Sequence, residues 1–130
     1  HILSIDEENL RCIIEPGITF DNLCQHLLPL GLLPLVIPEF KNITVGGAIQ
    51  GLGVESSSFK YGLFEDSVIS VDVVVGNGEI IQATSSSSSD LFFAMFGSYG
   101  TMGVLVKVEI QLMRAMPNLK ITCGNVFQKY

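Results

Sequence analysis

The clearest pattern in the chain is the alternation of residues over positions 104–112, where every second residue is apolar. Such alternation is typical of a strand with one buried and one solvent-facing side. Two further strand-like runs, 68–75 and 79–84, flank Gly76-Asn77-Gly78, and Asn-Gly between such runs is a strong hairpin signal. We expect five residues of the last strand to share its buried face: Val104, Val106, Val108, Ile110 and Leu112.

The N-terminal part is predicted to form a hairpin followed by a helix. Residues 3–5 and 10–15 are strand-like and are joined by a polar turn. Thr19 is a good N-cap, and apolar residues then recur at helical spacing up to Leu30, before Gly31 ends the helix.

A second, shorter helix is expected over residues 91–96, after the serine run 85–89, with its N-cap at Ser89 or Asp90. The order of elements is therefore hairpin, helix, extended segment, hairpin, short helix and strand. This order predicts an α+β fold with a mostly antiparallel sheet and flanking helices.

The least regular part is the segment 43–62, which holds five glycines, Thr44 and three consecutive serines but few charges. Glycine lets the backbone approach a bulky group closely, and hydroxyl and N–H groups can face an anion. We interpret the segment as a loop that holds a cofactor's pyrophosphate by dipoles and lets its ring lie flat on the backbone. The alternative is a set of tight turns in a β domain.

The composition narrows the range of partners. The chain has 130 residues, of which 48% are hydrophobic and 15% charged, against roughly 25% charged in a typical soluble domain. We therefore expect part of its surface to be covered by further protein, a large ligand or a membrane surface. The net charge of −6 and the scattered Lys and Arg residues exclude a nucleic-acid-binding surface.

The cysteines and the apolar runs exclude further classes. Cys12, Cys24 and Cys123 form no CxxC or Cys/His cluster, so we expect neither a metal site nor a disulfide scaffold. Reduced thiols fit an intracellular compartment. The longest apolar run, 27–38, contains prolines and is too short to span a bilayer. A chain that opens inside a strand indicates a piece of a longer polypeptide.

Several catalytic motifs are absent from the sequence, among them GxxxxGK[ST] and GxSxG. The run from Gly51 to Ser56 resembles part of a dinucleotide fingerprint, but it does not follow a strand, so we expect no Rossmann domain. The carboxylates near the glycine segment could act as acids or bases or simply be solvated. No catalytic residue is therefore assigned among Glu39, Glu55, Glu65 and Asp66.

The glycine segment and its flanks resemble a known flavoprotein family. The motifs are Thr44-Val-Gly-Gly47, Gly51-x-Gly53-x-Glu55-Ser-Ser-Ser58 and Lys60-Tyr-Gly-Leu-Phe64. They are similar to the second half of the FAD-binding domain of vanillyl-alcohol-oxidase (PCMH-type) flavoproteins, and most similar to the Δ24-sterol reductase branch. The likeness continues in order through residues 11–16, 89–94 and 100–105, and so covers almost the whole sequence.

The resemblance implies that residues 1–130 are the C-terminal part of an FAD-binding domain, with its first subdomain and the substrate cap domain outside this sequence. FAD would lie extended between two subdomains. It would be bound noncovalently, since no histidine lies in the glycine segment. By similarity, the following residues would contact it: Thr44, Val45, Gly46, Gly47, Ala48, Ile49, Gln50, Gly51, Leu52, Gly53, Val54, Glu55, Ser56, Ser57, Gly100, Gly103 and Val104.

The resemblance also implies an activity for the parent protein. It would reduce a carbon–carbon double bond in the tail of an apolar, sterol-like substrate, with NADPH as electron donor. It would be intracellular and, in a eukaryote, associated with endoplasmic-reticulum membranes. Two alternatives remain: an FAD-linked oxidase of a hydroxy acid, sugar lactone or alcohol, and a noncatalytic module that keeps the fold. Residues 31–34 and the serine run differ from the usual sequence of the Δ24-sterol reductase branch. The resemblance therefore determines the fold better than it determines the substrate.

Overall fold

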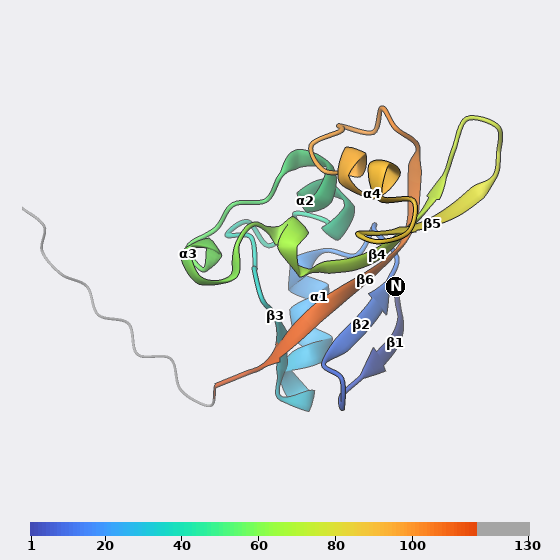
Figure 1. The fold of residues 1–130 in the computed structure, drawn as a ribbon. Coiled ribbons are helices and arrows are strands. Elements are labelled where there is room, and N and C mark those ends of the chain that lie inside the picture. The colour runs from blue at the N-terminus through green and yellow to red at the C-terminus, as the bar shows by residue number, and fades with distance from the viewer. Residues whose placement is uncertain (117–130) are drawn as a thin grey trace, which may run out of the picture.

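The computed structural model describes residues 1–116 (Figure 1), so Cys123 lies outside the described residues. The strands are β1 (Ile2–Asp6), β2 (Arg11–Ile14), β3 (Leu32–Pro34), β4 (Val68–Val74), β5 (Ile80–Thr84) and β6 (Val104–Arg114). The α-helices are α1 (Phe20–Leu27), α2 (Val45–Gly51), α3 (Ser58–Tyr61) and α4 (Ser89–Met95), and two 3-10 helices are η1 (Leu28–Leu30) and η2 (Phe64–Ser67).

One antiparallel sheet organises these elements. Its strand order is β1-β2-β6-β4-β5, and β3 pairs with the C-terminal end of β6. The long β6 therefore lies between the two predicted hairpins and joins them into one sheet (Figure 1). Every strand pair is antiparallel, which confirms the predicted α+β class with flanking helices.

Helix α1 is confirmed with its caps. Thr19 accepts a hydrogen bond from the Asn22 N–H through its hydroxyl oxygen at 3.3 Å. Gly31 follows η1 in the left-handed conformation with a φ of 69°, as expected of a glycine that ends a helix. The apolar face of α1 is buried, and the ring of Phe20 meets that of Phe64 edge to face at 5.1 Å. This contact ties α1 to η2 inside the core.

Strand β6 departs from the predicted alternation near its start. Val73 of β4 pairs with Leu105 and Asp72 pairs with Lys107, so Val106 is an extra residue in β6. Such a bulge reverses which side chains face the core. The predicted buried face is confirmed for Val108, Ile110 and Leu112, but it is wrong for the residues before the bulge. Leu105 is buried there, and Val104 is 64% exposed.

The glycine segment is not one loop, because its first part forms helix α2. The Thr44 hydroxyl accepts the Gly47 N–H at 3.1 Å and caps this helix. Val45 and Ile49 are fully buried in the core. The prediction of a loop was wrong because tertiary burial of these apolar residues, together with the cap, outweighs the low helix propensity of glycine.

Helix α4 and the segment that follows it lie beside α2 (Figure 1). The Gly97 N–H donates to the Ile49 carbonyl at 3.2 Å, and the Tyr99 N–H donates to the Gln50 carbonyl at 3.1 Å. These bonds fix residues 97–99 at the C-terminal end of α2. The N-cap of α4 is Ser88, one residue before the predicted position near Ser89 or Asp90, and its side chain makes no capping bond.

Candidate functional site

Helix α2 has one buried face and one face almost without side chains. Val45, Ala48 and Ile49 point into the core, whereas Gly47 and Gly51 are exposed on the outer side. A ligand or a second protein surface can therefore touch the helix backbone directly on this side.

The surroundings of each glycine show which ones the fold itself requires. A Cβ added at Gly51 would meet nothing within 4 Å, and one at Gly47 would meet only the Thr44 hydroxyl, at 3.1 Å. By contrast, a Cβ at Gly46 would lie 2.9 Å from the Pro16 Cβ. Gly53 fits between Ala48 and Phe64, each 3.4 Å from the added atom. Packing within the described residues thus explains Gly46 but not Gly51. A Cβ would make only ordinary contacts at Gly53, whereas at Gly47 it would press against the hydroxyl of Thr44 that caps the helix.

A groove of about 480 Å³ lies between α2 and the start of β6, and we call it the β6-side groove. No charged side chain lines it. It brings together seven of the residues expected to contact FAD, from two distant parts of the sequence: Thr44, Gly46, Gly47, Gln50, Gly100, Gly103 and Val104. Sequence reasoning missed three further lining residues: Pro16, Gly17 and Leu105.

The β6-side groove is built by backbone contacts between its walls. The Gly46 N–H donates to the Pro16 carbonyl at 2.8 Å, and the Val45 N–H donates to the Ile18 carbonyl at 2.9 Å. Thr19 and Thr44 form an isolated antiparallel bridge that joins the starts of α1 and α2. The sequence signal for this wall was the Pro16-Gly17 pair, which by itself indicates only the end of a strand.

These same bonds correct one part of the expected chemistry. The first N–H groups of α2, those of Val45, Gly46 and Gly47, all donate to acceptors within the protein. They are therefore not available to a pyrophosphate, contrary to the interpretation of the segment as an anion-binding loop. What this helix offers a ligand is a flat, uncharged surface.

A second groove, of about 260 Å³, lies on the other side of α2, and we call it the loop-side groove. It shares Gly47 with the first groove. Polar and apolar surface line it in about equal parts, and within residues 1–116 Glu55 is the only charged residue that lines it. It contains seven of the expected residues: Gly47, Ala48, Gly51, Leu52, Gly53, Val54 and Glu55. Pro38 and Ile43, which also line it, were not predicted.

The remaining expected residues lie outside both grooves. The side chains of Val45 and Ile49 are fully buried, so only their backbone could touch a ligand. The Ser57 hydroxyl donates to the Leu35 carbonyl at 3.2 Å and so holds the loop to the segment after β3. Ser56 is exposed and lines neither groove.

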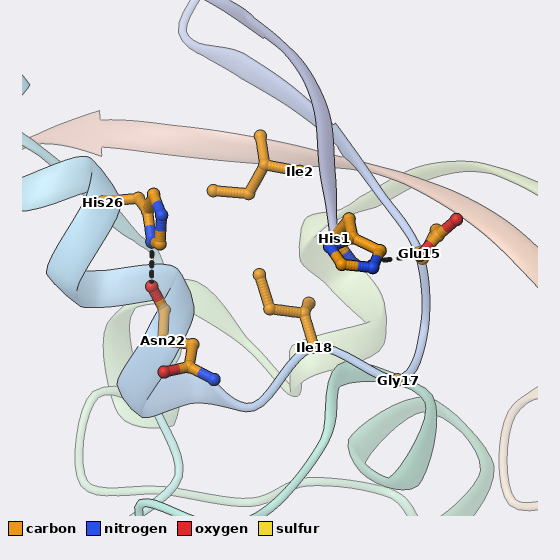
Figure 2. A pocket seen from close by; sticks show the side chains of 7 residues that line it. All are labelled: His1, Ile2, Glu15, Gly17, Ile18, Asn22 and His26. Atoms are coloured by element: carbon orange, nitrogen blue, oxygen red, sulfur yellow. Dashed lines mark hydrogen bonds and ion pairs between the residues drawn. The ribbon is translucent and has the colours of Figure 1, made fainter.

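A third hollow, of about 490 Å³, adjoins the β6-side groove at Gly17 (Figure 2). In it the ring Nδ1 of His26 lies 2.7 Å from the Asn22 carbonyl oxygen of the same helix. The amino group of His1 forms an ion pair with Glu15 at 3.0 Å. This polar hollow extends the line of the β6-side groove towards the start of β1.

Within residues 1–116, no group of three or more His, Cys, Asp or Glu side chains is placed to hold a metal ion. No helix in this range is long and apolar enough to cross a membrane. The two grooves beside α2 can therefore bind and orient a ligand on a surface that is uncharged except for the carboxylate of Glu55.

This combination of an antiparallel α+β layer and a glycine-faced helix between two grooves defines a ligand-binding domain of the flavoprotein type. Residues 1–84 match the family described as an FAD binding domain. The chain belongs to this FAD-binding domain family, and its fold is that of part of a PCMH-type domain.

Individual relatives agree with this assignment. The Delta(24)-sterol reductase of Pisum sativum is 37% identical over 94% of this chain and 22% of the relative. That of Homo sapiens is 38% identical over 92% of this chain and 23% of the relative. The solved structure of 6-hydroxy-D-nicotine oxidase from Arthrobacter nicotinovorans aligns with a TM-score of 0.79 and 26% identity, over 88% of this chain and 25% of that one. The chain thus spans about a quarter of the length of these proteins.

Proposed function

We propose that this chain is the part of a flavin-dependent oxidoreductase on which the flavin end of FAD rests. The observation that carries the proposal is the outer face of α2, which is almost free of side chains, lies between two grooves and is not explained by internal packing. The membership of the FAD-binding family supports it. Residues 1–130 would then be the second subdomain, and the first subdomain and the cap domain would belong to the rest of the polypeptide.

The residues present fit the uncharged part of FAD better than its pyrophosphate. A Cβ at Gly51 would project into open space where a flat ring could lie. The β6-side groove lacks any charged side chain, and the N–H groups at the start of α2 are already bonded. The pyrophosphate would therefore be held mainly by the other subdomain, without a covalent link to residues 1–130.

Bound FAD would supply the hydride-transfer chemistry of an oxidoreductase. The protein's own residues would orient the cofactor: the α2 backbone would support one face of the ring, while Gly100 and Gly103 would admit it at the edge of β6. The walls of the loop-side groove would shield one side of the ring from water, and Glu55 would offer a charged contact there.

For the parent protein we propose reduction of a carbon–carbon double bond in an apolar, sterol-like substrate, with NADPH as electron donor. The identity to Delta(24)-sterol reductases supports this class. An intracellular location, at endoplasmic-reticulum membranes in a eukaryote, would follow from it. The alternative is an FAD-linked oxidase, which the alignment with 6-hydroxy-D-nicotine oxidase supports.

The full-length protein, purified and examined under anaerobic conditions, tests the proposal. A yellow protein that NADPH bleaches would support the reductase. A yellow protein that NADPH leaves unchanged, but that a hydroxylated substrate bleaches, would support the oxidase. A folded, colourless protein that takes up no added FAD would contradict FAD binding and favour a noncatalytic module.

A further inference from the structure

A separate hollow of about 230 Å³ lies between η2 and α4, and we call it the η2–α4 hollow. It shares no residue with the two grooves beside α2. Its lining combines two carboxylates with three phenylalanines: Glu65, Asp66, Val68, Ser85, Phe92, Phe93 and Phe96. A volume of this size suits one side chain or one small organic molecule.

The aromatic wall comes entirely from α4 and the residue that follows it. The ring of Phe92 meets that of Phe93 at a centroid distance of 5.3 Å and that of Phe96 at 5.1 Å, both nearly perpendicular. Phe92 is buried, but Phe93 is 60% exposed, so part of its ring is open to a ligand. Aromatic rings attract cations at their faces and apolar groups at any angle.

The opposite wall carries negative charge that forms no ion pair with another side chain of residues 1–116. The Asp66 carboxylate accepts the Leu63 N–H at 2.8 Å and so is fixed at the start of η2. The Oε2 atom of Glu65 is buried and has no hydrogen-bond partner among the residues that the structure describes. Burial and, next, the charge of Asp66 raise the pKa of Glu65.

No ion pair within residues 1–116 satisfies this site. The ion pairs of this range join the N-terminus to Glu15, Arg11 to Glu109 and Lys107 to Asp72, all away from the hollow. A buried carboxylate oxygen without a partner is rare in native proteins and costs free energy until a donor reaches it. A cation would supply both the missing donor and the missing charge.

We propose that the η2–α4 hollow binds a basic group, an alkylammonium or a guanidinium, carried on a short apolar body. The cation pairs with Glu65, with Asp66 adding to the negative potential, and the apolar body packs against Phe93. The group comes either from a free organic amine or from a Lys or Arg side chain elsewhere in the polypeptide. This proposal is independent of the FAD site, because the two share no residue.

The test uses the full-length protein and two probes of nearly equal shape, 2-phenylethylamine, which is charged at pH 7, and neutral 2-phenylethanol. We expect calorimetric titration to give about tenfold tighter binding of the amine, the scale of one hydrogen bond to a charged group. Glu65→Gln should abolish this preference at nearly constant shape. Asp90→Asn, an exposed carboxylate on α4 outside the hollow, is the matched control and should retain the preference.

The thermal unfolding midpoint separates the two sources of the cation. If a basic side chain of the polypeptide already fills the hollow, the amine will not bind, and Glu65→Gln will lower the midpoint whereas Asp90→Asn will not. If no cation ever binds, Glu65→Gln will leave the midpoint unchanged or raise it, because it removes an unpaired buried carboxylate. Three results would overturn the proposal. The first is a protein that binds no amine and whose midpoint is unchanged or raised by Glu65→Gln. The others are equal affinity for the amine and the alcohol, and amine binding that survives Glu65→Gln.

Discussion

The glycines on the outer face of α2 and those at the base of the β6-side groove meet opposite requirements. Gly51 has open space around its missing side chain, whereas a Cβ at Gly103 would lie 2.6 Å from a methyl of Val73 and 2.7 Å from the Val74 carbonyl oxygen. The second kind of glycine lets two parts of the fold come together, and the first leaves room for something outside the protein. The same residue type therefore marks the scaffold in one place and a ligand surface in the other.

The largest expected effect is at the packed glycines. Gly103→Ala should reduce the free energy of unfolding by about 3 kcal/mol, because the new methyl overlaps both a side chain and the backbone of β4. Urea unfolding followed by circular dichroism measures it. Gly76→Ala is the matched control, since its Cβ would meet nothing within 4 Å, and it should change stability by less than about 0.5 kcal/mol. Equal stability of both variants would contradict the distinction between the two kinds of glycine.

The next effect concerns the open glycines and separates binding from folding. Gly51→Leu should leave the unfolding transition unchanged or slightly raised, because leucine has the higher helix propensity and its side chain enters open space. FAD affinity should fall at least a hundredfold, about 2.7 kcal/mol, because the side chain occupies the proposed place of the ring. Gly47→Val should also weaken FAD binding, but its Cβ would lie 3.1 Å from the Thr44 hydroxyl that caps α2, so we expect some loss of stability as well.

Flavin absorbance beside circular dichroism checks these variants. Full flavin content in both would remove the outer face of α2 from the cofactor site. Gly53 is not suited to this experiment, since its Cβ would touch Ala48 and Phe64, and a loss of FAD there could reflect a disturbed core.

The difference between packed and open positions also explains what the sequence could predict. The hairpins, α1 with its Thr19 cap and the α+β class follow from local patterns, and the structure confirms them. The bulge at Val106 could not be predicted, because it depends on the register between β4 and β6 rather than on the alternation within β6. Helix α2 was missed because its stability comes from tertiary burial of Val45 and Ile49.

The candidate site shows the same division. The family resemblance implied that residues 44–57, Gly100, Gly103 and Val104 contact one ligand. The two grooves beside α2 bring together all of these except Val45, Ile49, Ser56 and Ser57. Pro16 and Gly17 were missed because nothing local shows that the end of β2 lies against Gly46. The availability of the Val45 and Gly46 N–H groups could not be judged either, since their acceptors are the distant carbonyls of residues 18 and 16.

A smaller effect is expected at the polar residues of the site loop. Glu55 lines the loop-side groove, where a ligand could reach its carboxylate. Glu55→Gln should weaken FAD binding by up to about tenfold without stopping turnover at saturating FAD. Fluorescence titration with FAD and steady-state kinetics measure the two quantities.

Ser57→Ala serves as the comparison for Glu55. It removes the bond to the Leu35 carbonyl and should lower stability by about 1 kcal/mol while leaving the FAD affinity near that of the wild type. If Glu55→Gln instead abolishes turnover at full FAD occupancy, Glu55 takes part in the reaction. If it behaves like Ser57→Ala, its role is structural.

The smallest expected effect concerns the two thiols of Cys12 and Cys24, of which one is buried and the other partly open. Cys12 is 1% exposed, and burial raises its pKa to about 11. Cys24 is only partly buried, and its pKa is raised first by burial and then by the negative charge of Asp21. Only the thiolate reacts with iodoacetamide, so a cysteine with a lower pKa has a larger thiolate fraction at pH 8 and is alkylated faster. Asp21→Asn should therefore speed the alkylation of Cys24 a few-fold and leave Cys12 unreactive, which mass spectrometry of the separate peptides resolves. An equal acceleration at both cysteines would show that the substitution loosens the core rather than shifting one pKa.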